Sequence, residues 1–162
     1  MRTTKKASHK KRWAIIGVLI VIILAVGGGY YWNMGHSVAK RIPGNTYRYQ
    51  STANDKSLYL TFSKNDNKVV VNQNKTIALD AAQSQSAFDK EYTTQSKTIN
   101  WSYKAEGGTL TLAQLKANKV SQWQYNKILA TSNKFTARSF TYQIAQAGQG
   151  QVKGKAVFEK VN

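Results

Sequence analysis

The sequence predicts an N-terminal transmembrane helix followed by a mainly β (α+β) exported domain. Three observations lead to this fold class: an uncharged apolar run near the N-terminus, alternation of apolar and polar residues after it, and a single stretch with helical periodicity. The expected architecture is an antiparallel small barrel or sandwich of about 7 to 8 strands with one helix. The expected segments are a basic cytoplasmic tail at 1–12, an anchor at 13–32, a linker at 33–45 and the β-rich domain at 46–162.

The anchor is predicted from the run WAIIGVLIVIILAVGGGYYW, which contains no Asp, Glu, Lys or Arg. About 20 helical residues span the roughly 30 Å apolar core of a bilayer. Representative membrane-spanning positions are Trp13, Ile16, Leu19, Ile23, Val26 and Trp32. Six Lys and Arg residues precede the run, and cationic flanks stay in the cytoplasm. We therefore expect a single-pass protein of the cell membrane with its C-terminal domain outside the cytoplasm.

A cleaved signal peptide is the alternative to this anchor. Small residues at positions −3 and −1 mark a cleavage site, and Ser37-Val38-Ala39 has this pattern. Cleavage after Ala39 would yield a secreted basic protein. The chain has no cysteine, so it offers neither a lipid-attachment site nor a disulfide.

The chain is strongly basic, with a net charge of +17. Removing the tail leaves 18 basic and 7 acidic residues, a net charge of +11. Anionic cell-wall polymers or lipid headgroups are the partners that this charge suggests. The basic residues are dispersed, however, which favours an ordinary solvated surface and does not favour nucleic acid.

The first strands are expected as a series ending in a hairpin. In TYRYQ, Tyr47 and Tyr49 share a face, and in SLYLTFS the apolar positions alternate in the same way. Residues 64–67 (KNDN) form a turn, because Asn and Asp tolerate left-handed backbone. The strand at 68–72 then pairs back.

The period changes to three and four residues over 75–92, where we expect one amphipathic helix capped by Asn74 or Thr76. Strand periodicity returns at 98–104, with a turn at 106–108 and a returning strand at 109–112. Residues 113–119 fit either a helical turn or a loop. Further alternating segments follow, with a turn at 147–150 and a last strand at 152–161.

The exported domain has few groups that could carry out catalysis. The two histidines, His9 and His36, lie outside it, so no Ser-His or Cys-His unit and no zinc site of the usual type is expected there. A carboxylate pair is the remaining route to hydrolysis, and the candidates are Asp80, Asp89, Glu91 and Glu106. Scattered among many lysines, these acids are more typical of surface ion pairs. No catalytic residue, metal ligand or cofactor is therefore predicted.

The aromatic residues are the main binding candidates. Possible ligand or polyanion contacts are Tyr47, Tyr49, Trp101, Tyr103, Trp123, Tyr125, Lys104 and Lys127. Aromatic rings beside amide donors suit sugar rings, and rings beside lysines suit single-stranded nucleic acid. Aromatic residues at alternate strand positions are also the ordinary filling of a β-sheet core.

The layout resembles small single-pass cell-surface proteins of Gram-positive bacteria. Within the domain, Gly44-Asn45-Thr46-Tyr47 followed by SLYLTFSKNDNKVVV is similar to the first strands of lipocalin-like barrels, over residues 44–71. Tyr47 stands where those barrels usually have Trp, and the helix at 75–92 interrupts the meander. The resemblance implies a cup for a small apolar ligand.

The expected function is a membrane-anchored, non-catalytic domain that binds or senses a component of the bacterial cell envelope. Two alternatives remain open besides secretion. The domain is an accessory subunit that docks on a partner membrane protein, or it is an envelope hydrolase that uses carboxylates such as Asp89 and Glu91.

Overall fold

The structure is a computed structural model, and it describes residues 29–30, 32–33, 35–51, 56–144 and 147–161. The chain divides into two compact units, Met1–Asn33 and Met34–Asn162. In the first unit the described residues, Gly29, Tyr30, Trp32 and Asn33, are helical.

The predicted N-terminal transmembrane helix requires a correction. Among the described residues, no helix combines the length and the apolar character that crossing a bilayer needs. The three helices with defined bounds have 4, 8 and 12 residues, whereas a span needs about 20. The prediction of a single-pass membrane anchor is therefore not supported. Of its marked positions, Trp13, Ile16, Leu19, Ile23 and Val26 lie outside the described residues, and Trp32 is helical with an exposed side chain.

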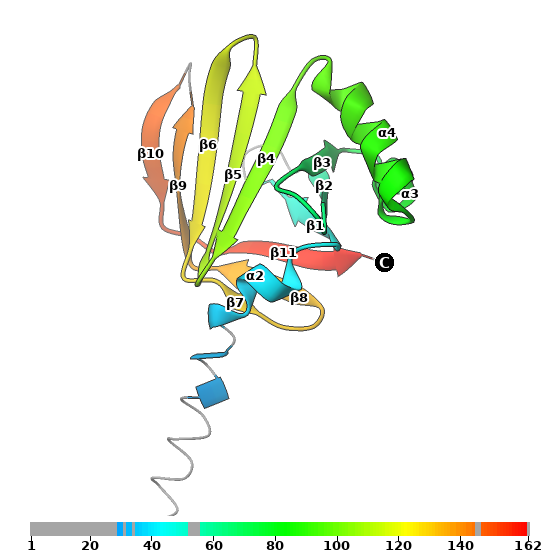
Figure 1. The fold of residues 1–162 in the computed structure, drawn as a ribbon. Coiled ribbons are helices and arrows are strands. Elements are labelled where there is room, and N and C mark those ends of the chain that lie inside the picture. The colour runs from blue at the N-terminus through cyan, green and yellow to red at the C-terminus, as the bar shows by residue number, and fades with distance from the viewer. Residues whose placement is uncertain (1–28, 31, 34, 52–55, 145–146, 162) are drawn as a thin grey trace, which may run out of the picture. The chain divides into compact units, whose positions relative to one another are not determined.

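The second unit is mainly β, with two antiparallel sheets (Figure 1). One has six strands in the order β3-β2-β1-β11-β8-β7, and the other has five in the order β10-β9-β6-β5-β4. The strand bounds are β1 Thr46–Gln50, β2 Ser57–Phe62, β3 Val69–Asn72, β4 Asn100–Glu106, β5 Thr109–Lys116, β6 Lys119–Asn126, β7 Leu129–Ala130, β8 Lys134–Ala137, β9 Ser139–Ile144, β10 Gly148–Val152 and β11 Ala156–Val161.

Residue alternation decides which face of each strand is buried. The predicted hairpin of SLYLTFS at 57–63 and the strand at 68–72 is confirmed as β2 and β3, with Phe62 opposite Val69. Leu60 and Phe62 point into the main core, as the period-two pattern predicts. Val70 points to the opposite face, where it forms a second cluster with Ala81 and Phe88. Both faces of β3 are therefore covered, which explains its continuous valine run.

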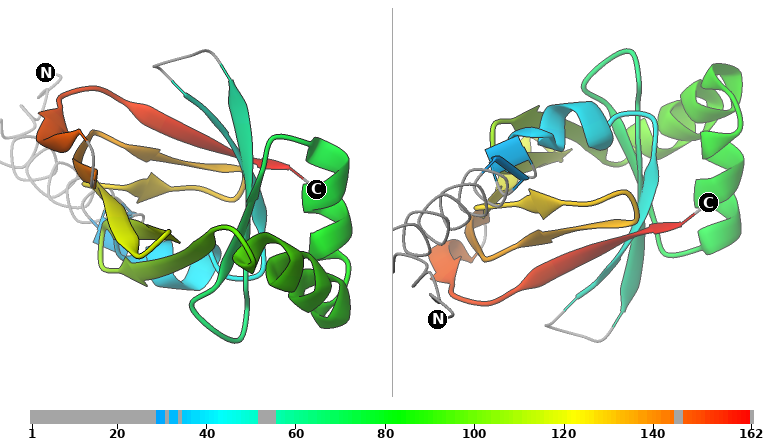
Figure 2. Two further views of the ribbon diagram at one scale, coloured as in Figure 1. Left: turned by 90° about the horizontal axis from the view of Figure 1, so that it is seen from above. Right: turned by 90° about the horizontal axis from the view of Figure 1, so that it is seen from below.

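The predicted single helix at 75–92 is instead two helices, α3 Lys75–Ala82 and α4 Gln85–Ser96. Asn74 caps α3, as expected, and Ser84 caps α4 by accepting a hydrogen bond from the Ala87 amide at 3.1 Å. An extended residue at Ser84 interrupts the helical backbone, which is why the periodic segment divides. The helices lie against the outer face of β2 and β3 (Figure 2).

Residues 33–45, expected as a linker, contain the short helix α2 Val38–Arg41 and belong to the folded unit from Met34 onward. Val38 and Ile42 are fully buried in the main core, and α2 contacts β4 and β7. The hypothetical cleavage after Ala39 would divide this helix and remove the buried Val38 side chain.

The main core lies between the two sheets and is rich in aromatic rings. Phe135 and Phe158 stack at 4.3 Å between centroids, and Tyr47 meets Phe135 edge-on at 4.8 Å. The Tyr47 hydroxyl donates to the Arg41 carbonyl at 2.9 Å, so it ties β1 to α2.

Candidate functional site

The intersheet space contains an apolar cavity of about 350 Å³, which we call the intersheet cavity. Its lining comes from both sheets and consists of Tyr49, Ser51, Leu58, Leu60, Val71, Trp101, Leu112, Trp123, Tyr125, Phe140, Tyr142, Ile144, Val152 and Phe158. None of these fourteen described residues is charged. The volume falls in the range of about 300 to 1,000 Å³ that small-molecule sites occupy.

Strand alternation directs these side chains inward. On β6, Trp123 and Tyr125 face the cavity while Gln122 and Gln124 line a separate hollow. The register continues this face across the sheet, because Trp123 lies opposite Tyr142 and Tyr125 lies opposite Phe140. Aromatic residues spaced by two along β6 and β9 therefore build one continuous wall.

Strand β10 leaves room in this wall because two of its residues are glycines. Gly148 lies opposite Ile144 and Gly150 lies opposite Tyr142, whose side chains line the cavity. A methyl group placed on Gly150 would overlap the Cζ and Oη atoms of Tyr142. The Tyr142 ring thus occupies the volume that a side chain at position 150 would fill.

The cavity has a buried floor and more accessible walls. Phe158 is fully buried, and Leu60, Leu112 and Tyr125 are each 4% exposed or less. The other ten lining residues are half-buried. Apolar surface that stays partly accessible to solvent in this way can gain free energy when a ligand covers it.

The hydroxyl groups of Tyr49 and Tyr125 place polar atoms in the mainly apolar lining of the cavity. Burial raises the pKa of Tyr125 far above its usual value, and the neighbouring Tyr49 hydroxyl raises it further. The rings of Tyr49 and Tyr125 lie edge to face at 6.3 Å. Tyr125 therefore stays protonated at neutral pH and interacts as a neutral hydroxyl.

A tryptophan pair forms a flat part of the wall. Trp101 and Trp123 stack with ring centroids 5.4 Å apart and planes inclined by 26°. The Trp101 carbonyl accepts a hydrogen bond from Tyr92 of α4 at 3.2 Å. Helix α4 therefore holds the strand that carries this ring.

Four of the six aromatic residues predicted as ligand contacts come together in the cavity: Tyr49, Trp101, Trp123 and Tyr125. Tyr47 is 2% exposed and packs in the main core, outside the cavity lining. Tyr103 packs edge-on against Phe62, and its hydroxyl donates to the Ser63 carbonyl at 2.7 Å. These two rings have structural positions outside the cavity.

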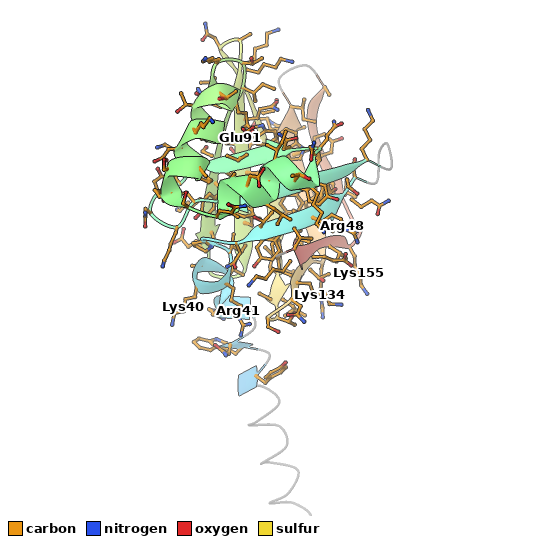
Figure 3. All side chains as sticks on the ribbon, turned by 90° about the vertical axis from the view of Figure 1, so that its right-hand side faces the viewer. Lys40, Arg41, Arg48, Glu91, Lys134 and Lys155 are labelled. Atoms are coloured by element: carbon orange, nitrogen blue, oxygen red, sulfur yellow. The ribbon has the colours of Figure 1, made fainter. Side chains whose placement is uncertain are left out.

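The two lysines predicted as contacts do not line the cavity. Lys104 is exposed and forms an ion pair with Glu106 at 2.6 Å, which raises the pKa of Lys104 and lowers that of Glu106. Lys127 lies between β6 and β7 with a positive φ of 52°. Other basic side chains, among them Lys40, Arg48 and Lys155, point outward from the side shown in Figure 3.

The candidate catalytic carboxylates are dispersed. Asp89 and Glu91 are two residues apart on α4, and residues at this spacing do not face each other on a helix. Asp89 accepts a hydrogen bond from Gln85, Asp80 accepts one from Gln83, and Glu106 is paired with Lys104. Among the described residues, no group of three or more His, Cys, Asp and Glu side chains is placed to hold a metal ion.

The lining residues that sequence reasoning did not single out as contacts are mainly aliphatic, such as Val71, Leu112 and Val152. The alternating pattern indicates their inward face, but a core position and a cavity position give the same pattern. Gly148 of β10 is the local signal of vacant space, since nothing lies within 4 Å of a methyl group placed there, whereas the Tyr142 ring fills the space beside Gly150.

No protein family, curated protein or solved structure matches the chain.

Proposed function

We propose that this protein is a non-catalytic binding domain that takes up the uncharged, apolar part of a small molecule in the intersheet cavity. The observation that carries the proposal is an accessible 350 Å³ cavity lined mainly by apolar and aromatic side chains. An ordinary sandwich core closes this space by interdigitating its side chains. Here the half-buried wall leaves it open for a ligand.

The lining defines the chemical class of the ligand. An ionised group buried without a counter-ion is strongly disfavoured, so the inserted part carries no charge. Flat rings or hydrocarbon chains suit the aromatic walls, including the stacked Trp101 and Trp123. The hydroxyls of Tyr49 and Tyr125 supply a hydrogen-bonding point for one polar atom of the ligand. The similarity of residues 44–71 to lipocalin-like barrels agrees with a ligand of this class.

The proposal is tested by titrating the 162-residue chain with the neutral fluorophore N-phenyl-1-naphthylamine, whose emission rises in apolar surroundings. The informative variant is Val152→Phe, because Val152 lines the cavity and a larger side chain would fill part of it. Val157→Phe is the matched control, because Val157 is 38% exposed and faces solvent on strand β11 of the other sheet.

We expect saturable fluorescence enhancement with the native chain and with Val157→Phe. Val152→Phe should bind at least about tenfold more weakly, which corresponds to a loss of about 1.4 kcal/mol. Equal affinity in all three chains would show that the probe binds elsewhere. An absence of saturable enhancement with the native chain would rule the proposal out.

A further inference from the structure

We propose a second, independent binding site on the outer face of the five-stranded sheet, where a neutral, hydroxyl-rich ligand such as a polysaccharide chain would bind. The site is a hollow of about 490 Å³, and we call its six polar side chains the amide face. They are Gln122, Gln124, Thr141, Gln143, Gln149 and Gln151. Tyr142 and Gly150 complete the lining.

The amide face is an ordered array because its members are in register across three strands. Gln122 of β6 lies opposite Gln143 of β9, which lies opposite Gln149 of β10. The next outward-facing row along the same strands consists of Gln124, Thr141 and Gln151. Neighbouring strands are about 4.8 Å apart, so each row presents hydrogen-bonding groups at short, regular intervals.

The lack of charge indicates what the amide face binds. The chain carries 24 Lys and Arg residues, yet none of the eight described residues lining this hollow is charged. Charged residues lie on the outer sheet faces beyond this hollow. Arg48, Glu159 and Lys134 lie opposite one another on the six-stranded sheet, and Lys104 of β4 lies in the row of Gln124, two strands away. A solvated sheet face in this protein thus carries charges elsewhere, whereas this hollow matches an uncharged ligand.

Carboxamides suit hydroxyl groups because each offers two donors and one acceptor oxygen, and a hydroxyl both donates and accepts. Gln124 and Thr141 are half-buried within the array, and Gln124 is held by a 3.0 Å hydrogen bond from its Nε2 to Asn126. Peptide strands are recognised by main-chain hydrogen bonds at sheet edges. The amide face lies on the surface of the sheet, which favours a ligand that is bound by hydrogen bonds from side chains.

The six side chains of the amide face are all absent from the lining of the intersheet cavity, and Tyr142 is the one described residue that lines both hollows. Aromatic residues and amides alternate along β6 and β9, so the rings point inward and the amides point outward. A ligand on the amide face therefore binds through hydrogen bonds with little aromatic stacking, and substitutions there leave the cavity lining unchanged.

The test is affinity electrophoresis of the 162-residue chain in native gels that contain a soluble neutral glucan, mannan or galactan. We expect at least one polysaccharide to retard the native chain, and the triple variant Gln122→Ala, Gln143→Ala, Gln149→Ala to bind at least about tenfold more weakly. The single variant Gln143→Lys, which places a charge in the centre of the face, should also bind more weakly. The control removes three exposed glutamines beside or on α3 and α4, Gln73→Ala, Gln83→Ala and Gln85→Ala, and should be retarded like the native chain.

Two further measurements are the dependence of retardation on salt concentration and the binding of the fluorophore by the triple variant. Retardation should be unchanged between about 50 mM and 200 mM salt, because no counterions are released on binding a neutral polymer. The triple variant should still bind N-phenyl-1-naphthylamine if the cavity binds it at all, and its circular dichroism should match the native chain. Failure of all three polysaccharides to retard the native chain overturns the proposal. Equal retardation of the triple variant, or retardation that disappears with salt, also overturns it.

Discussion

At the scale of single residues, Gly150 and Tyr142 define one wall of the intersheet cavity. Gly150→Ala would place a methyl group against the Tyr142 ring, so the ring has to move. We expect the free energy of unfolding to fall by about 1 to 3 kcal/mol, as overpacking usually costs, and the fluorophore to bind more weakly. Urea denaturation and the fluorescence titration measure the two effects.

Gly154→Ala is the control for this substitution. The nearest atom to a methyl group there is Val152 Cγ1 at 3.7 Å, an ordinary contact. We expect its free energy of unfolding to stay within about 0.5 kcal/mol of the native value. A loss as large as that of Gly150→Ala would mean that the Tyr142 contact has no special role.

The buried tyrosines predict how stability depends on pH. Burial raises the pKa of Tyr47 to about 12, against 10.0 in its ordinary state. The folded state therefore holds the phenol proton more tightly than the unfolded state. Its stabilising contribution is complete below pH 10 and is lost as the pH rises toward 12.

We expect the free energy of unfolding, measured with urea, to fall as the pH rises from about 10 to 12. Tyr47→Phe removes this ionisable group and should make the fall less steep, although it also removes the hydrogen bond to Arg41. Burial also raises the pKa of Tyr92, Tyr103 and Tyr125, so part of the dependence should remain. An identical slope in the variant would contradict the assignment to Tyr47.

At the scale of elements, the separation of α3 from α4 depends on the Ser84 cap. Ser84→Ala removes the oxygen that accepts from the Ala87 amide, so we expect the free energy of unfolding to fall by about 1 kcal/mol. Ser86→Ala also removes a serine hydroxyl, but inside the first turn of α4 and not at its cap, so it is the matched control. Equal effects of the two substitutions in urea denaturation would exclude the cap as the cause.

The local elements could be read from the sequence where neighbouring residues determine them. Asn and Asp at 64–67 and Gly107-Gly108 predict two of the turns, and alternation gives the inward face of β2 and β6. The division of the helix at Ser84 was missed, because its periodicity continues on both sides. The Ser84 side chain was the available signal, since serine favours an N-cap over a helix interior.

The candidate site could be predicted only in part. Tyr49, Trp101, Trp123 and Tyr125 were identified as candidate contacts, but their assembly depends on pairing between distant strands. Strand β11 pairs with both β1 and β8, and no local sequence pattern predicts these two pairings. Whether an inward residue meets another side chain or open space is likewise set by the packing of two sheets, which the alternation does not encode.

At the scale of the whole molecule, α2 belongs to the folded unit. Val38 is fully buried, so a chain that begins at Lys40 loses a core side chain and half of α2. We expect that chain to unfold at lower urea concentration than one that begins at Met34, with a loss of at least about 1 kcal/mol in the free energy of unfolding. Equal stability would mean that α2 contributes nothing and that cleavage after Ala39 is compatible with the fold.

The central claim is that an apolar molecule occupies the space between the two sheets. The most direct measurement is NMR detection of intermolecular nuclear Overhauser effects between N-phenyl-1-naphthylamine and methyl groups of the 162-residue chain. We predict contacts to Val71, Leu112 and Val152, whose side chains line the intersheet cavity. Contacts confined to Val120 and Val157, which are exposed, would contradict the claim.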